Sequence, residues 1–376
     1  MIDSEAVALE VLKATVQREL LADRISVVSR ALSSRASVLV LSGILLRATD
    51  AGIEVSATDM EVSLRAKLEA SVAGGGQVVV PGRLLLDIAR ALPSGEVSLE
   101  YLAEESVLLV TSGSASYRLH TYSAEDFPHL PDLSAVALQP VDGEALLGTI
   151  QRVSKSASRD ESRPVLTGIF VSFEGERLVM AATDSYRLAV KETVAPGPLP
   201  ELEAIIPARA LQELSRIAVP GEPIELAVQE NHVVFGSAGV WLTSRRIDGQ
   251  FPNYRQLLPE QFEHELELPR EELLDVVRRV GLLAQRNSPL RLRFADGELT
   301  VSARTQDVGE AQESLPAPFT AEALEIGFNA EFLRDGLESI DSETVRFKLI
   351  SPLRPAVLQG ESSDYTYLIM PIRLAG

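Results

Sequence analysis

Cysteine is absent from this 376-residue sequence. Its absence excludes a disulfide framework and a thiolate metal site, and it indicates a reducing compartment. Long hydrophobic runs are also missing: the longest, 38–46, is too short to span a bilayer and is interrupted by Ser42 and Gly43. The acidic residues 1–5 lack the pattern of a signal peptide. We therefore expect a soluble, cytoplasmic protein with no membrane partner.

Signatures of enzymatic chemistry are absent as well. The sequence contains no nucleophile elbow, zinc-protease motif, Walker loop or dinucleotide-binding motif. The four histidines are scattered without metal-ligand spacing, and we interpret them as ordinary surface or turn residues: His120, His129, His232 and His264. The sequence thus predicts no catalytic residue, no metal and no cofactor.

Positive charge is scarce, since the formal net charge is −19. Such a balance argues at first sight against a nucleic-acid partner. Net charge governs solubility and long-range fields, however, whereas the local distribution of charge decides what a given face can bind. The distribution along the chain is therefore the more informative property.

What the sequence does contain is an internal repeat. The segment 39–46 followed by 57–64 corresponds to 165–171 followed by 181–190, with Gly43 matching Gly168 and Thr58 matching Thr183 at one spacing of 125 residues. A weaker third copy covers 290–294 and 299–307. Units of this length are domains rather than solenoid turns. We predict three copies of one domain, at 1–137, 138–262 and 263–376.

Each copy combines two predicted helices with roughly eight strands. Apolar residues recur at helical spacing in six windows, which are 18–35, 82–92, 145–163, 207–217, 270–288 and 329–341. Alternating, strand-like runs with Gly and Asp turns lie between them. This order predicts an α+β fold in which two helices per copy pack on antiparallel sheets. Asp59 and Glu61 resemble a catalytic acid pair, but because the other copies do not keep the pair we interpret them as strand-end and turn acids.

The predicted helices are more basic than the rest of the chain. Five of the six windows contain more Lys and Arg than Asp and Glu, and only 329–341 departs from this trend. Any surface helix has charges on its solvated face, but repetition at equivalent places favours one electropositive surface that accepts phosphates without reading bases. The residues expected to contact phosphate on this surface are Arg24, Arg35, Arg152, Lys155, Arg159, Arg163, Arg209 and Arg279.

Three separated motifs resemble the bacterial DNA sliding clamps, the β subunits of the DNA polymerase III holoenzyme. They are 183–190 (TDSYRLAV), 251–259 (FPNYRQLLP) and 367–374 (YLIMPIRL), and the segment 307–311 is similar to the actinobacterial branch. The resemblance implies a non-catalytic processivity factor whose two chains join head to tail in a closed ring around DNA. It also implies a dimer interface that includes Leu119, Leu282 and Leu283, although these could instead be ordinary core leucines.

The resemblance further implies a hydrophobic pocket between the second and third domains. There the DNA polymerase III alpha subunit, the clamp loader, and other polymerases and repair proteins would insert a short peptide. Carried over by position, its residues are Leu166, Thr183, Ser185, Tyr186, Arg187, Leu188, Pro252, Leu257, Leu368 and Met370, with Pro371 and Arg373 beside them. We expect Arg187 and Arg373 at the rim, where they would attract an acidic residue of the partner. The alternative is a final strand that is merely buried in the third domain.

Two other functions compete with this interpretation. An enzyme that used the clefts between repeats, such as a hydrolase, would need a nucleophile and a base in at least one copy, and none is found. A repeat scaffold that binds only proteins would not segregate basic residues onto its helices. The sequence therefore favours a clamp over both.

Overall fold

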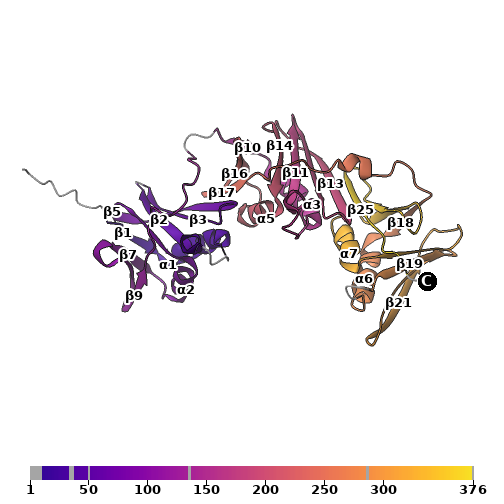
Figure 1. Cartoon of the computed structure of the whole chain (residues 1–376), viewed down its shortest axis with the longest axis horizontal. Helices are drawn as coiled ribbons and strands as arrows, with labels where there is room; N and C mark the ends of the chain where they lie inside the picture. The colour runs from indigo at the N-terminus through magenta and orange to yellow at the C-terminus, as the bar shows by residue number, and fades with distance from the viewer. Residues whose placement is uncertain (1–10, 34–37, 50, 134–136, 285–287, 375–376) are drawn as a thin grey trace, which may run out of the picture. The chain divides into compact units, whose positions relative to one another are not determined.

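The computed structural model describes residues 11–33, 38–49, 51–133, 137–284 and 288–374. Its contacts divide the chain into two compact units, 1–143 with 216–245 and 144–215 with 246–376. The division cuts through the second sequence repeat, because an eight-stranded sheet in each unit combines strands from two neighbouring repeats. Each unit is described by itself below (Figure 1).

The first unit contains two antiparallel sheets. The five-stranded sheet has the order β5-β1-β7-β8-β9, and the eight-stranded sheet has the order β10-β15-β16-β17-β4-β3-β2-β6. The strands are β1 Lys13–Gln17, β2 Gly43–Thr49, β3 Gly52–Thr58, β4 Val62–Leu68, β5 Ser71–Gly74, β6 Gln77–Pro81, β7 Glu96–Leu102, β8 Val107–Ser112, β9 Ala115–His120, β10 Gln139–Val141, β15 Ile224–Val228, β16 His232–Ser237 and β17 Val240–Arg245. Helices α1 (Arg18–Val28) and α2 (Gly82–Ala91) pack against each other.

The second unit repeats this plan. Its eight-stranded sheet has the order β14-β11-β12-β13-β25-β24-β23-β18, and its four-stranded sheet has the order β21-β20-β19-β22. The strands are β11 Gly168–Glu174, β12 Arg177–Thr183, β13 Arg187–Val194, β14 Leu202–Pro207, β18 His264–Pro269, β19 Leu290–Ala295, β20 Glu298–Thr305, β21 Gly309–Pro316, β22 Leu324–Phe328, β23 Thr344–Leu349, β24 Ala356–Gln359 and β25 Tyr365–Ile369. The helices are α3 Gly143–Val153, α4 Pro164–Thr167, α5 Ala208–Ile217, α6 Arg270–Gly281 and α7 Ala330–Glu338, and α6 packs against α7.

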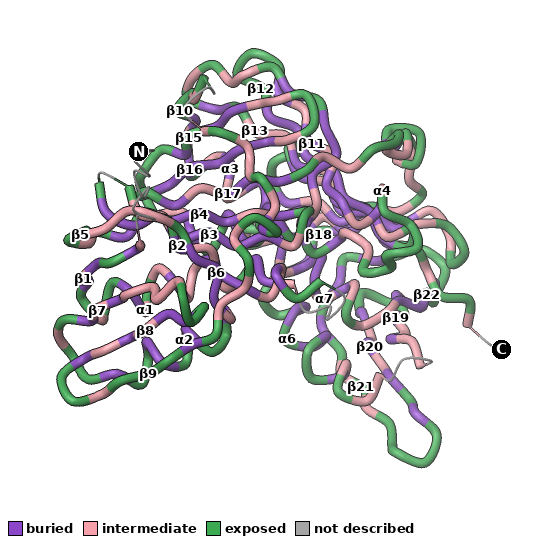
Figure 2. The backbone as a smooth tube through the Cα atoms, turned by 60° about the vertical axis from the view of Figure 1, so that its left-hand side comes forward, coloured by how far each residue is buried: buried purple, intermediate pink, exposed green. Residues whose placement is uncertain are grey.

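Apolar side chains at helical spacing form the buried face of each long helix. In α1 the buried residues are Leu21, Ile25 and Val28, which follow one another at intervals of one turn. Strand residues alternate between buried and exposed faces, and the buried stretches run through the sheets while the exposed ones gather in the loops (Figure 2). The α+β fold with helices packed on antiparallel sheets is confirmed.

The six predicted helices are present, but three of them end about two turns or more before the predicted residue. Helix α1 ends at Val28, α3 at Val153 and α6 at Gly281. After α3 the chain continues as a 3₁₀ turn, Ser154–Ser156, and then as a loop up to Pro164. The prediction of a helix through residue 163 was therefore wrong, and Arg159 and Arg163 lie in the loop.

Candidate functional site

Two turns, one in each unit, share a single hydrogen-bond pattern. We call 58–62 the first turn and 183–187 the second turn. The Thr58 hydroxyl donates to the Val62 carbonyl at 3.2 Å, and the Thr183 hydroxyl donates to the Arg187 carbonyl at 2.7 Å. In each turn one oxygen of the following aspartate accepts two backbone N–H groups, at distances of 2.9 to 3.1 Å. The interpretation of these acids as turn residues is confirmed.

Each turn also binds a strand of the next sequence repeat. The Arg245 N–H donates to the Glu61 carbonyl at 2.9 Å, and the Met370 N–H donates to the Tyr186 carbonyl at 2.8 Å. Strand β4 pairs with β17 in the first unit (Figure 2), and β13 pairs with β25 in the second (Figure 1). Both pairings have the same register, shifted by 125 residues on both strands. We call β4, β17 and the first turn the first junction, and β13, β25 and the second turn the second junction.

The second junction has an apolar floor. Leu188 and Leu368 are directly opposite each other across β13 and β25. They share a buried cluster with Ala181, Tyr254 and Val357, and five partly buried side chains pack against it: Phe170, Val190, Phe251, Leu258 and Phe262. Sequence reasoning missed the aromatic part of this floor, in which the Phe170 ring lies 5.6 Å from the Phe251 ring and 6.1 Å from the Tyr254 ring.

Large apolar side chains remain exposed at this junction. Tyr186 is 62% exposed, Leu257 is 50% exposed and Met370 is 39% exposed. Leu257 ends a 3₁₀ turn that begins at the buried Tyr254. We call Tyr186, Leu257 and Met370 the second-junction surface. Exposed apolar side chains on a rigid, buried support are typical of an interaction site.

The other residues predicted for this site take several positions. Leu166 and Thr183 are buried, and Thr183 serves the turn. Ser185 is exposed and accepts a hydrogen bond from Arg163 at 3.0 Å. Pro252 and Pro371 are half-buried, whereas Arg373 is exposed.

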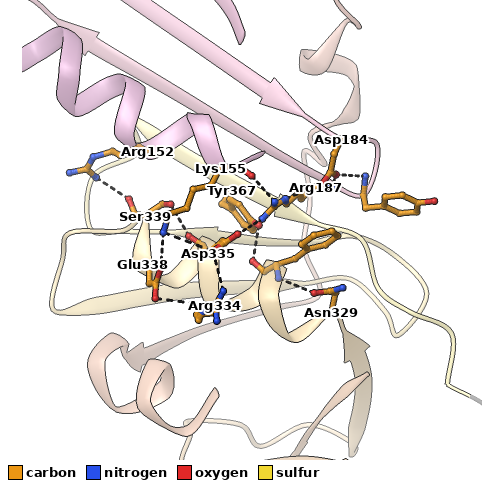
Figure 3. Close-up of polar contacts among 12 residues, drawn as sticks. Arg152, Lys155, Asp184, Arg187, Asn329, Arg334, Asp335, Glu338, Ser339 and Tyr367 are labelled. Carbon is orange, nitrogen blue, oxygen red and sulfur yellow. Dashed lines mark hydrogen bonds and ion pairs between the residues drawn. The ribbon is translucent and has the colours of Figure 1, made fainter. Parts of the chain in front are cut away.

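Arg187 is not at the rim as predicted. Its side chain is 5% exposed, and its guanidinium donates to Asp184 at 3.0 Å, to Asp335 at 2.7 Å and to the Lys155 carbonyl at 2.5 Å (Figure 3). The guanidinium carbon also lies 4.2 Å from the centre of the Phe332 ring. Burial alone would lower the pKa of Arg187, but neighbouring groups that include Asp335 raise that pKa above its ordinary value. This arginine is an internal support and cannot attract an acidic partner residue.

Ion pairs with cations of the second repeat explain the acidic character of α7 and the residues after it. Glu338 pairs with Lys155 at 2.7 Å, Asp341 pairs with Arg152, and Asp335 pairs with Arg187. The hydrogen bond from Arg152 lowers the pKa of Asp341. Burial raises the pKa of Glu338, but its cationic partners lower that pKa by a larger amount, so the net shift is downward. Two of these carboxylates belong to α7 and Asp341 follows it; all three pair with cations of the second repeat, which accounts for the acidic character of the segment 329–341.

Most of the predicted DNA-facing cations are held by carboxylates. Besides Arg152 and Lys155, the pairs are Arg24 with Asp23, Arg163 with Asp160, and Arg279 with Glu313. Arg159 and Arg209 are exposed. Arg35 lies outside the described residues. Contact of these side chains with DNA stays a prediction.

The leucines predicted for a dimer interface differ in exposure. Leu119, on β9, is buried at 4% exposure within its own unit, so its side chain offers no free surface. Leu282, at the end of α6, is 82% exposed, and Leu283 is half-buried. Strand β9 is at the end of its sheet, as is β21 in the second unit. Both strands therefore leave one side without a neighbouring strand in the described part of the chain.

Two further properties bear on function. None of the helices in the described ranges is long and apolar enough to cross a membrane. In the same ranges, no three side chains among His, Asp and Glu are grouped to hold a metal ion.

Comparison with known proteins gives matches along nearly the whole chain. The N-terminal, central and C-terminal domains of the DNA polymerase III beta subunit match residues 12–131, 140–253 and 255–373. A beta sliding clamp of Streptomyces coelicolor is 35% identical, over 97% of this chain and 100% of its own. The beta sliding clamp homolog GriR of Streptomyces muensis is also 35% identical, over 95% and 98%.

Solved structures show the same similarity. The Pseudomonas aeruginosa sliding clamp bound to griselimycin superposes with a TM-score of 0.87 at 28% identity. The superposition covers 97% of this chain and 100% of that one.

Proposed function

The chain belongs to the DNA polymerase III beta subunit family, the bacterial sliding clamps, and on this premise we propose that the second junction is where its partners dock. Its function is that of a non-catalytic processivity clamp for DNA polymerase. The partners proposed for the second junction are the DNA polymerase III alpha subunit, the clamp loader, and other polymerases and repair proteins that carry a short hydrophobic peptide. We place this activity in the cytoplasm.

One observation carries the assignment of the docking surface. The two junctions have the same backbone, but at four pairs of equivalent positions only the second junction has an apolar side chain; the exposed apolar residue of the first turn, Met60, is instead equivalent to Ser185. The pairs, second junction first, are Tyr186 and Glu61, Leu188 and Ser63, Leu368 and Thr243, and Met370 and Arg245. A hydrophobic peptide would be favoured at the second junction and disfavoured at the first, where it would have to desolvate Glu61 and Arg245.

Simple energetics agree with a surface that exchanges partners. A flexible peptide loses conformational entropy when it becomes ordered on a protein. Two or three buried apolar anchors contribute roughly 1.5–3 kcal/mol each before that loss. Peptide binding should therefore be micromolar at the strongest, which corresponds to a binding free energy of about −8 kcal/mol. Binding of that strength lets several partners use one clamp in turn.

We further propose that two chains form the ring through their free strand edges. The β9 edge of one chain would pair with the β21 edge of the other, and the exposed Leu282 would be covered in that contact. A head-to-tail contact of this kind closes into a ring when its rotation fits. Each chain would contribute three domains, which we place at 1–137, 138–262 and 263–376.

The proposed ring would hold duplex DNA without reading its sequence. Arg159 is exposed, whereas Arg152 and Lys155 would have to leave or share the carboxylates of Asp341 and Glu338 to reach a phosphate. Direct affinity for DNA should therefore be weak, because encirclement rather than tight contact would retain the protein.

The docking surface can be tested with a fluorescent peptide from the polymerase alpha subunit. Met370→Ala should abolish measurable peptide binding, while sedimentation still shows the dimer and the clamp loader still places it on nicked circular DNA. Met60→Ala, in the first turn, is the matched control and should bind peptide like the wild type. Unchanged binding by Met370→Ala would refute the assignment.

Deletion of residues 370–376 is a poorer test, because the tail has structural contacts. The Ile372 N–H donates to the Gly327 carbonyl at 2.8 Å. The Leu374 side chain covers Gly327 so closely that an added Cβ would lie 2.6 Å from it. The deletion would therefore also free the edge of β22.

A further inference from the structure

The second turn has a connection that the first turn does not need. Both turns form with the same hydrogen bonds, yet Val62 occupies the position of Arg187 in the first turn. A valine cannot form ion pairs, so the turn itself does not depend on an arginine at this position. The buried arginine must have another role in the second unit.

That arginine joins the second-junction surface to α7 through a continuous chain of hydrogen bonds, which we call the relay. The Asp335 carboxylate accepts from Arg187 at 2.7 Å, and Arg187 donates to one oxygen of Asp184 at 3.0 Å. The other oxygen of Asp184 accepts the Tyr186 N–H at 2.9 Å, and the Tyr186 carbonyl accepts the Met370 N–H at 2.8 Å. Figure 3 shows Arg187 lying between Asp184 and Asp335. Every link from α7 to the exposed surface is thus a hydrogen bond of ordinary length.

Other contacts fix the α7 end of this relay. Asp335 is buried at 8% exposure, and the Tyr367 hydroxyl donates to the Phe332 carbonyl at 2.7 Å. Phe332, in turn, lies under the Arg187 guanidinium. A buried carboxylate that is held on a packed helix orients its partner more strictly than a solvated one, because neither charge has water as an alternative partner.

We infer that Asp335 is a positioning residue for the partner site: through Arg187 and Asp184 it sets the placement of Tyr186 and Met370. It does not itself contact the partner. The inference rests on the proposed docking surface, and it extends that proposal to a residue on a helix of the third repeat.

The methionines allow a direct test in the full-length dimer. Of the four methionines, Met370 lies at the second junction, Met60 lies in the first turn and Met180 is buried in β12. In protein labelled with ¹³C-methyl methionine, Asp335→Asn should shift the Met370 resonance and leave the Met60 and Met180 resonances in place. The dissociation constant of the fluorescent alpha-subunit peptide should rise about tenfold in the same variant.

Two further variants separate positioning from stability. Glu338→Gln removes another α7 carboxylate, which pairs with Lys155 and Arg278 rather than with Arg187, and should leave peptide affinity unchanged. The double variant Arg187→Val with Asp335→Leu removes both buried charges, so it should recover thermal stability that Asp335→Asn loses. Under the inference it should not recover peptide affinity, because the relay is still missing.

The outcomes are distinct. Wild-type peptide affinity in folded Asp335→Asn, or recovery of affinity together with stability in the double variant, would overturn the inference. If Asp335→Asn does not fold, the double variant decides alone. Failure of the underlying docking proposal would look different, since the peptide would then leave the Met370 resonance of the wild type unshifted.

Discussion

The two junctions of this protein are the same piece of backbone used in two ways. Turn hydrogen bonds, strand register and the link to the next repeat all recur at a spacing of 125 residues. Polar or charged side chains (Glu61, Ser63, Thr243 and Arg245) occupy the first junction at the positions where the second has Tyr186, Leu188, Leu368 and Met370. The comparison teaches that the repeated backbone provides the framework, while a few side chains decide which copy can bind a hydrophobic partner.

The comparison also separates support from contact. Arg187 and Met370 both belong to the second junction, but the first is buried between two carboxylates and the second is exposed. Only exposed residues can contribute binding energy to a partner directly. A residue exchange between equivalent positions of the two junctions therefore tests whether a residue supports the site or contacts the partner. The reverse exchange at the other junction serves as the control.

The largest effect is expected when a buried residue of the second junction is replaced by the residue found at the equivalent position of the first junction. Leu188→Ser, the residue found at Ser63, should lower the free energy of unfolding by about 2–5 kcal/mol, because it leaves a cavity and an unpaired hydroxyl in a fully buried site. Urea unfolding would measure it. Ser63→Ala is the control and should cost about 1 kcal/mol, since it loses one hydrogen bond to Thr58. Equal losses of unfolding free energy in Leu188→Ser and Ser63→Ala would contradict the claim that the two junctions differ in their buried side chains.

The next effect concerns partner binding. Met370→Arg, which copies Arg245, should weaken binding of the alpha-subunit peptide at least as much as Met370→Ala does, by more than about 100-fold, because it removes an apolar anchor and adds a charge that the peptide must desolvate. The reverse exchange, Arg245→Met, should leave peptide affinity unchanged, because Glu61 and Thr243 still disfavour an apolar ligand there. Isothermal titration of both variants would measure it. If Arg245→Met alone bound the peptide at the first junction, a single side chain would determine peptide binding there, and Glu61 and Thr243 would not be needed to prevent it.

The smallest effect is a dependence on pH that comes from Glu338 and Asp341 in the second unit. The folded-state pKa values of Asp341 and Glu338 lie below their usual 3.8 and 4.5. A carboxyl group whose pKa is lowered by folding stabilises the protein above its unfolded-state pKa, and this contribution is lost as the pH falls through the folded-state pKa. Both groups are partly solvated, so the loss should not exceed about 1 kcal/mol. Asp341→Asn should flatten the acid limb of a melting-temperature profile, and an unchanged profile would contradict the assignment.

Much of this framework could be predicted from the sequence, because repeats and periodicity are local patterns. The spacing between Thr58 and Thr183 predicted the recurring turn, and the apolar stripes predicted all six long helices. Helix ends were less predictable: α3 ends at Val153, before Arg159, although the apolar spacing continues to Ala157. The apolar pattern alone carries little information about the residue at which a helix ends.

The candidate site was predictable where it follows the motifs and not where it depends on distant packing. Tyr186, Leu188, Leu368 and Met370 follow from the family motifs. The burial of Arg187 does not, because its partner Asp335 lies 148 residues away. The unusual acidity of α7 was the available signal, and it could have indicated cationic partners in the preceding repeat.

The most direct test of the central claim is a photo-crosslinking experiment at two equivalent positions. A photoreactive amino acid would replace Tyr186 in one protein and Glu61 in the other, and each would be irradiated with the same alpha-subunit peptide at equal concentration. The account predicts a crosslink at position 186 and none above background at position 61. A crosslink at position 61 equal to or stronger than that at position 186 would contradict it, because the shared backbone rather than the side chains would then select the partner.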